Sequence, residues 1–275
     1  MIVGLSISES PDLERLGFSD LHLRDAMIEF ARHLLAFGHG IAYGGDLRPS
    51  GFTMALRDFV GTFAHGSGKV HNYLAWHVHK SAVKKNLVDL ARVAQLHYCK
   101  LPLPSKTFPS FKRASVSRAM ALTEMRKEMG RAIGARLLLG GKLAGYKGLL
   151  PGLLEETVLA IRASMPVYLV GAFGGCTAAI IDVLLGHKRL DLVMSETGNP
   201  ERMELFDGYR KCGMDPERLI KEAVATVADT GIEALAHQNG LTPKENRVLF
   251  DSSDLDLVIS LLLKGLSQKS RRPRK

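Results

Sequence analysis

Short apolar segments alternate with amphipathic helical segments along the first two thirds of the chain, and this alternation restricts the fold more than any other feature. The segments expected to be strands are 2–7, 41–43, 70–76, 135–139 and 167–170, and those expected to be helices are 20–37, 52–63, 85–98, 117–133, 153–163 and 175–185. Strands separated by such helices pair in parallel, because each connection crosses the sheet through a helix. The pattern predicts a Rossmann-like, doubly wound α/β fold, with helices on both faces of a mostly parallel sheet.

The last third of the chain is predicted to be mainly helical. Asp215 and Pro216 are typical of a helix start, because an acidic N-cap accepts backbone N–H bonds and proline fits the first helical position. Thr230 can begin a further helix, and Ser253 or Asp254 can cap the last one. We therefore expect a helical C-terminal region packed beside the sheet.

The basic charge of the chain is concentrated at its C-terminus. The formal net charge is +9, but it falls to +4 without the five cations of the last seven residues. Such a tail can contact nucleic acid or anionic lipid, although a solvated, disordered terminus is the simpler interpretation. Because no proline- or serine-rich linker and no repeat divides the rest, we expect one domain over residues 1–266 and a flexible tail over 267–275. Segment 100–114 contains three prolines and is expected to be a loop or flap.

The sequence gives no sign of export, membrane insertion or metal binding. The N-terminal MIVGLSIS lacks the basic region of a signal peptide, and no apolar run reaches the roughly 18 residues that a membrane span needs. Cys99, Cys176 and Cys212 are odd in number and widely spaced, which argues against disulfides or a zinc site. His77 and His79 are expected on one strand face without a third ligand. We expect a cytoplasmic protein with no membrane partner and no bound metal.

Four polar or glycine-rich stretches follow expected strands, where ligands bind in open α/β sheets. Their candidate ligand-binding residues are Ser6 and Ser8; Gly44, Gly45, Asp46, Arg48 and Thr53; Gly141, Lys142 and Gly152; and Gly171, Phe173, Gly174 and Gly175. Glycine lets backbone N–H groups approach an anion, the following helix adds its positive end, and hydroxyls bind phosphate or ribose. A single cluster of this kind is more often a tight turn, but four at strand ends favour a phosphate-bearing ligand. None is a GxGxxG or Walker A sequence, so neither a standard dinucleotide site nor an ATPase is indicated.

Three charged residues have both a structural and a functional interpretation. Glu155 and Glu156 fall in the first turn of an expected helix, where they can simply complement the helix dipole. Either one can instead bind ribose hydroxyls or stabilise an oxocarbenium ion, which makes both candidate catalytic residues of an enzyme. Arg126 borders the buried face of its helix, as a solvated charge or as a bidentate phosphate clamp. The sequence leaves these alternatives open.

Several stretches together resemble the SLOG superfamily. These are SISESPDL and GFSDLHL near the N-terminus, YGGDLRPSGFT, the pair MR at 125–126, GGKLAGYKGLLPGLLEE and PVYLVGAFGG. The resemblance covers most of residues 1–186, and the ending NGLTPKENRVLFDSSDLDLVISLLLKGL is similar to the C-terminus of these domains. It implies a Rossmannoid nucleotide-sensing domain of bacterial conflict and antiphage defence systems, which binds NAD-derived or cyclic ADP-ribose-like nucleotides in a pocket formed by these loops.

The superfamily also includes the Lonely guy phosphoribohydrolases, whose signature is PGGxGTxxE with an arginine on an upstream helix. The corresponding stretch here begins at Pro151 and Gly152 and keeps an acid, and Arg126 resembles the upstream arginine. The second glycine and the Gly-Thr pair are missing. This departure argues against hydrolysis, because the narrow turn and its phosphate contacts depend on small residues.

Three functions follow from these observations. The favoured hypothesis is a nucleotide-derivative binding protein that acts as a sensor, requires no cofactor, and works through a homo-oligomer or a separate effector protein. The alternatives are an N-glycoside hydrolase that cleaves a base from a nucleotide, and a nucleic-acid-binding or adaptor protein that uses the basic tail and segment 100–114.

Overall fold

The centre of the protein is a six-stranded, entirely parallel sheet, which confirms the predicted Rossmann-like α/β class. The computed structural model describes residues 1–45, 47–63, 69–101, 114–188 and 199–270. Within these residues the strand order is β4-β3-β2-β1-β5-β6. The strands are β1 (Ile2–Ser8), β2 (Gly40–Gly44), β3 (Val70–Leu74), β4 (Gln95–Tyr98), β5 (Ala135–Gly140) and β6 (Val167–Val170).

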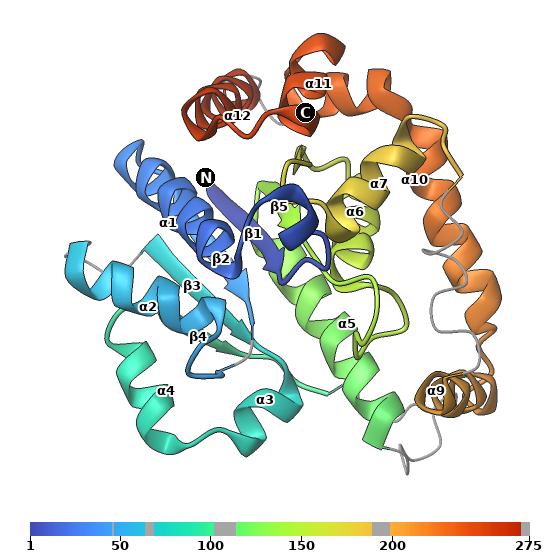
Figure 1. Cartoon of the computed structure of the whole chain (residues 1–275). Helices are drawn as coiled ribbons and strands as arrows, with labels where there is room; N and C mark the ends of the chain where they lie inside the picture. The colour runs from blue at the N-terminus through green and yellow to red at the C-terminus, as the bar shows by residue number, and fades with distance from the viewer. Residues whose placement is uncertain (46, 64–68, 102–113, 189–198, 271–275) are drawn as a thin grey trace.

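Helices cover both faces of the sheet. Figure 1 shows the strands between α1 and α2 on one side and α5 and α6 on the other, with the C-terminal helices beyond. The helices are α1 (Asp20–Ala36), α2 (Phe52–Phe63), α3 (Trp76–Ser81), α4 (Lys84–Ala91), α5 (Ala114–Ala132), α6 (Gly152–Arg162), α7 (Gly175–Leu184), α9 (Pro200–Lys211), α10 (Pro216–Asn239), α11 (Pro243–Asp251) and α12 (Leu255–Ser270). Within the described ranges, none of them is long and apolar enough to cross a membrane.

Helix α1 begins and ends where the sequence predicts. The Ser19 hydroxyl and the His22 ring form a capping box at its start, which satisfies N–H groups that have no partner within the helix. At its end Gly38 adopts φ 81°, and its N–H donates to the Leu35 carbonyl at 3.0 Å. This left-handed conformation suits glycine, and it turns the chain back into β2.

The order of the strands creates a switch point beside β1. Strand β1 pairs with β2 through Leu5 and Tyr43 and with β5 through Ser8 and Gly140. The chain moves outward from β1 to β4, and α5 then carries it back across the sheet to β5. The connections that leave β1 and β5 therefore diverge, and this divergence opens a crevice at the carboxyl edge of the sheet.

The prediction for residues 70–98 was wrong in two places. The expected helix over 85–98 ends at Ala91, and the segment Gln95–Tyr98 is the edge strand β4. This strand is short, half-exposed and stabilised by pairing with β3, for example His71 with Gln95, so its local pattern does not reveal it. The expected strand over 70–76 stops at Leu74, which places His77 and His79 on helix α3 rather than on a strand.

The C-terminal helices begin as predicted, with one difference. The Asp215 side chain accepts the Arg218 N–H at 2.9 Å, and Asp254 accepts the Leu257 N–H at 3.2 Å. The helix expected to begin at Thr230 is the second part of α10, which is kinked at the non-helical Gly231. Helix α12 continues to Ser270, beyond the expected start of the tail at residue 267, and residues 271–275 lie outside the described residues. Most of the predicted flap, residues 102–113, lies outside them as well.

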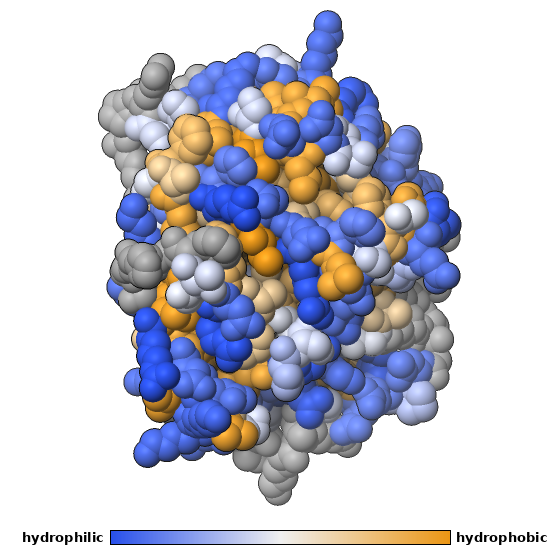
Figure 2. Space-filling model, turned by 60° about the vertical axis from the view of Figure 1, so that its left-hand side comes forward, coloured by the Kyte–Doolittle hydropathy of each residue, from blue (hydrophilic) through white to orange (hydrophobic). Residues whose placement is uncertain are grey.

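Hydrophobic side chains on the surface are dispersed. Leu21 and Phe37 of the α1 region are each 66% exposed. On the face shown in Figure 2, hydrophobic residues form several patches that are separated by hydrophilic ones. Isolated apolar residues of this kind are normal for a protein surface and do not by themselves indicate an interface.

Candidate functional site

A cavity of about 250 Å³ lies at the carboxyl ends of β1 and β2, and we call it the β1–β2 cavity. Its lining residues are Leu5, Ser6, Ile7, Ser8, Glu9, Tyr43, Gly44, Gly45, Arg48, Phe52, Ala75, His77, Val78, Leu122, Met125, Arg126, Lys147, Gly152, Leu153 and Glu156. A wider depression of about 670 Å³ adjoins this cavity and shares Arg48, His77 and Val78 with it. The cavity thus lies where the α/β topology places ligands.

Some of the predicted site residues line the β1–β2 cavity, and others lie outside its lining. The predicted residues that line the β1–β2 cavity are Ser6, Ser8, Gly44, Gly45, Arg48, Arg126, Gly152 and Glu156. The predicted residues outside its lining are Thr53, Gly141, Lys142, Glu155, Gly171, Phe173, Gly174 and Gly175. Asp46 lies outside the described residues. Ligand contact by any of these residues stays a prediction, but the first group shares one cavity.

Two helices direct their positive ends toward the cavity. Phe52, the first residue of α2, and Gly152 and Leu153, the first residues of α6, are among the lining residues. The first N–H groups of a helix have no partner within the helix, and the helix dipole adds partial positive charge at that end. The two helix starts therefore provide an environment that favours a bound anion.

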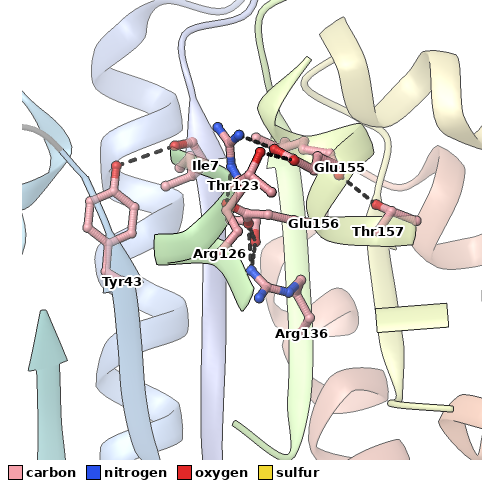
Figure 3. Close-up of polar contacts among 10 residues, drawn as sticks. Ile7, Tyr43, Thr123, Arg126, Arg136, Glu155, Glu156 and Thr157 are labelled. Atoms are coloured by element: carbon pink, nitrogen blue, oxygen red, sulfur yellow. Dashed lines mark hydrogen bonds and ion pairs between the residues drawn. The ribbon is translucent and has the colours of Figure 1, made fainter. Parts of the chain in front are cut away.

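A buried network of four charged side chains lies next to the cavity (Figure 3). The Arg126 guanidinium donates to the Glu155 carboxylate and forms an ion pair with Glu156 at 3.4 Å. Glu156 also accepts from Arg136 at 2.5 Å and from the Ser6 hydroxyl, which in turn accepts from Arg136 at 2.8 Å. The two arginines and two glutamates balance in charge, which is what allows so many ionised groups to be buried together.

The network explains the role of Arg126 better than a phosphate clamp does. Although burial opposes its charge, Glu155 and Glu156 outweigh that effect and raise the pKa of Arg126 above its ordinary value. A Cβ atom at Gly152 would lie 2.8 Å from Arg126 Nη2, so the guanidinium packs directly against the start of α6. Arg126 thus holds the first turn of α6 in place, and only a glycine at position 152 leaves room for it.

Arg136 is a site residue that the sequence interpretation missed. Its side chain is 1% exposed although it belongs to the otherwise apolar strand β5. Burial lowers the pKa of Arg136 below its ordinary value, with Glu156 acting against this shift and Arg126 adding to it. A lone arginine within an apolar strand was the available signal, because a buried cation requires a buried acid as its partner.

The glycines after β2 are required by close packing. A Cβ atom at Gly45 would lie 2.3 Å from the Tyr43 ring and 2.6 Å from Thr53 Oγ1, and one at Gly44 would lie 2.9 Å from Met125 Cε. A side chain at Gly45 would displace the Tyr43 ring, whose hydroxyl donates to the Ile7 carbonyl at 3.4 Å, whereas one at Gly44 would require only the flexible end of Met125 to move. Thr53 itself is 1% exposed and lies behind this loop. The compact loop therefore exposes its backbone to the cavity.

Other residues of the protein occupy the space beside the glycine-rich stretch that follows β6. The Gly175 N–H at the start of α7 donates to the Asp12 carboxylate at 2.7 Å. A Cβ atom at Gly174 would lie 2.5 Å from Asp12 Cβ, and one at Gly171 would lie 2.3 Å from the Phe250 carbonyl oxygen. An internal carboxylate thus occupies the helix end where the sequence predicts an external anion.

Charged side chains surround the opening of the β1–β2 cavity. Arg48 contacts Glu9 at 3.0 Å, Lys142 contacts the same carboxylate at 3.4 Å, and Lys147 contacts Glu201 at 3.3 Å. Burial opposes ionisation of Glu9, but its backbone hydrogen bond, Lys142 and Arg48 outweigh this and lower the pKa of Glu9. Arg48 and Lys147 are half-exposed, at 53% and 51%, so they can reorient toward an incoming anion.

Aromatic side chains supply flat surfaces on the same cavity. Tyr43, Phe52 and His77 all belong to its lining, and the sequence interpretation assigned a ligand role to none of them. Burial, together with the charge of Arg118 and the proximity of His79, lowers the pKa of His77. Its Nδ1 atom is buried without a hydrogen-bond partner among the described residues. His77 therefore faces the cavity mainly as a neutral ring with an unsatisfied polar atom.

The described residues contain no group of three or more histidine, cysteine, aspartate or glutamate side chains arranged to hold a metal ion. The β1–β2 cavity offers hydroxyls, backbone N–H groups, helix ends, cations and aromatic rings, together with the carboxylates of Glu9 and Glu156, which are both paired with cations. These are the groups that recognise a phosphate, a sugar and a base.

Comparison with known proteins agrees with this fold. Residues 1–249 match the family described as SLOG cluster2. Since the match covers most of the chain, the protein belongs to the SLOG cluster2 family, which confirms the resemblance to the SLOG superfamily. No curated protein matches the chain significantly. Family membership fits a nucleotide-related Rossmannoid domain.

Proposed function

We propose that this protein binds a phosphate-bearing, nucleotide-derived small molecule in the β1–β2 cavity and acts as a ligand sensor. One observation carries the proposal: the hydroxyls of β1, the compact glycine loop after β2 and the starts of α2 and α6 line the same cavity. Each of these features favours an anionic or hydroxyl-rich ligand, and the family to which the chain belongs agrees with a nucleotide.

We expect different parts of the ligand to contact different parts of the cavity. The phosphate is expected near the start of α6, with Arg48 and Lys147 turning from their exposed ion pairs toward it. The ribose is expected beside the Ser8 hydroxyl. The base is expected against Tyr43, Phe52 and His77, because aromatic rings stack on base faces. The adjoining depression of about 670 Å³ gives room for a ligand larger than a mononucleotide.

The acids at the cavity favour binding over hydrolysis. Cleavage of an N-glycosidic bond needs a carboxylic acid or carboxylate that is free to act at the ribose. Glu156 is held by Arg136, Arg126 and Ser6, and the two charged neighbours of Glu9 keep the pKa of Glu9 low. Glu155 is absent from the lining of this cavity. We therefore rank the N-glycoside hydrolase second.

Calorimetric titration of AMP, ADP-ribose and adenosine tests the proposal. If phosphate recognition dominates, AMP should bind at least tenfold more tightly than adenosine, which corresponds to about 1.4 kcal/mol. Arg48→Ala and Lys147→Ala should each weaken AMP binding by roughly threefold to tenfold. Lys221→Ala, which removes an exposed lysine of α10 far from the lining, is the matched control and should leave AMP binding unchanged.

Chromatography of the same mixtures separates sensor from enzyme. We expect the nucleotides to remain intact after prolonged incubation. Release of free adenine that is abolished by Glu156→Gln would establish the hydrolase instead. Equal affinity for AMP and adenosine would contradict phosphate recognition and with it the proposed function.

A sensor acts through a further protein or through its own assembly. We propose that ligand binding is communicated to an effector protein or within a homo-oligomer, as expected for a nucleotide sensor in antiphage defence. Light scattering with and without the bound nucleotide measures whether the ligand changes the assembly.

A further inference from the structure

A second cavity, larger and more apolar, lies on the other side of the buried ion-pair network. It has a volume of about 440 Å³ and is enclosed by α5, α6, the end of α9 and α10, and we call it the α5–α10 cavity. Apolar side chains of these helices and of the segments that join them line it, among them Met120 of α5, Leu150 before α6, Val158 of α6, Met214 between α9 and α10, and Leu219 of α10. It shares no lining residue with the β1–β2 cavity.

Adjacent glutamates of α6 face the two different cavities. Glu156 lines the β1–β2 cavity, whereas Glu155 lines the α5–α10 cavity. One Glu155 oxygen accepts from the Thr123 hydroxyl at 2.5 Å and the other accepts from Arg126. Because each carboxylate oxygen can accept two hydrogen bonds, both have capacity for another donor. The apolar cavity thus ends in a buried negative group.

A second polar group lies among the same apolar walls. Tyr209 is 5% exposed, lines the cavity, and makes no hydrogen bond through its hydroxyl to any residue that the structure describes. Burial raises the pKa of Tyr209, with the nearby charge of Glu155 adding to the shift, so the phenol remains protonated. A phenol hydroxyl can donate and accept a hydrogen bond, so it is available to a molecule bound in the cavity.

The charges at the edge of the cavity do not favour an anionic occupant. Glu124 pairs with Lys127 at 2.7 Å, Arg162 donates to Thr226 at 3.1 Å, and Glu222 lies on the lining from α10. The edge is therefore mixed in sign, and the charged group that reaches the interior is the Glu155 carboxylate, whose partner Arg126 lies outside this lining. An apolar wall with an acidic end complements a molecule with an apolar body and a cationic end.

We propose that the α5–α10 cavity is a binding site for a small amphipathic amine, whose apolar body packs between α5 and α10 and whose ammonium group donates to Glu155. The volume suits a single aromatic or alicyclic body, and Tyr209 supplies a further hydrogen bond. This site is independent of the nucleotide site, so its test does not depend on the outcome at the β1–β2 cavity.

Methyl NMR of protein labelled at the methionine methyl groups tests the proposal, with tryptamine as the probe and tryptophol as its uncharged analogue. Met120 and Met214 line the α5–α10 cavity, and Met125 lines the other one. Tryptamine should shift the Met120 and Met214 signals in a saturable manner, with a Kd of roughly 1 mM for so small a probe, and should leave Met125 unchanged. Tryptophol should bind at least fivefold more weakly.

Three variants distinguish binding in the α5–α10 cavity from nonspecific binding elsewhere on the protein. Glu155→Gln should reduce tryptamine affinity at least fivefold, because it removes the negative charge and one of the two acceptor oxygens, and it should change tryptophol affinity much less. Leu159→Trp should fill the cavity from its half-buried edge and remove the shifts of both methyls. Ile161→Trp, on the same helix but outside the lining, is the control and should bind normally.

Other outcomes overturn the proposal. These are the absence of saturable shifts in the wild-type protein, equal affinity for the two probes, and tryptamine shifts that persist in the Leu159→Trp variant. Shifts of Met120 and Met214 that depend on protein concentration, without any probe, would assign the cavity to a second copy of the chain and would also overturn it.

Discussion

Replacing Arg136 by methionine tests whether the buried network supports the site. Methionine keeps an unbranched apolar stem but lacks the guanidinium, so the substitution leaves Glu155 and Glu156 opposed by Arg126 alone. Side-chain exposures are 1% for Arg136, 9% for Glu156 and 10% for Arg126. The change therefore converts a balanced buried cluster into one with an excess negative charge.

The structure sets the size of the expected effect. Arg136 contributes the hydrogen bond of 2.5 Å to Glu156 and that of 2.8 Å to Ser6, whereas Arg126 approaches Glu156 only at 3.4 Å. Removing one partner of a buried ion pair costs about 3–5 kcal/mol, because the remaining charge stays buried. For a protein of this size we expect the Tm to fall by roughly 10 °C.

Urea unfolding of the single and double variants measures the loss. Glu156→Gln removes the unpaired charge, so the Arg136→Met/Glu156→Gln protein should be less destabilised than the sum of the two single variants, by about 1–3 kcal/mol. Arg162→Met, which changes an exposed arginine on α6, is the control and should shift the stability by less than about 0.5 kcal/mol.

Two results would show that Arg136 does not stabilise the buried network. The first is a loss below about 1 kcal/mol for Arg136→Met, which is the range of an exposed ion pair. The second is strict additivity of the two substitutions, because it would show that the two side chains do not interact in the folded protein.

Three further predictions concern packing, thiol reactivity and pH. Gly45→Ala should cost about 1–3 kcal/mol in urea unfolding, because its Cβ would lie 2.3 Å from a Tyr43 ring atom. Gly130→Ala has nothing within 4 Å of its Cβ, so this control should be neutral or stabilising. Equal effects of the two substitutions would contradict the packing argument. Burial, with Glu128 adding to it, raises the pKa of Cys99 to about 12. Iodoacetamide at about pH 8 should therefore label this thiol on the order of 10³-fold more slowly than a free thiol. Rapid labelling of Cys99 in the folded protein would contradict the raised pKa. Burial lowers the pKa of both His71 and His97. Below about pH 6.5 the folded state therefore binds fewer protons than the unfolded state. The free energy of unfolding should fall as the pH falls through that range. A stability that is constant or rises toward pH 5 in denaturant titrations would contradict this sign.

The strand and helix alternation was sufficient to predict the fold class. Five of the six strands follow from apolar segments whose burial is nearly complete, as in β5 and β6. Strand β4 could not be recognised because its four residues are half-exposed and depend on pairing with β3. Its stability comes from a partner distant in sequence, which local periodicity does not report.

The sequence predicts the parts of the candidate site that follow the ends of strands. It does not predict the parts that depend on contacts between distant side chains. The stretches after β1 and β2 and the start of α6 meet at one cavity, as parallel topology requires. The stretch after β6 does not join them, because Asp12 occupies the start of α7. That contact joins residues 163 positions apart in the sequence, so only the folded structure reveals it.

Methyl NMR during a titration with AMP measures directly whether the β1–β2 cavity binds the nucleotide. Met125 lines that cavity, whereas Met120 and Met214 line the α5–α10 cavity of the same molecule. We expect AMP to cause a saturable shift of the Met125 methyl signal, adenosine to cause a much weaker one, and the Met120 and Met214 methyl signals to change little. Saturable shifts at Met120 and Met214 while Met125 stays unchanged, or no shift at any methionine, would contradict this expectation.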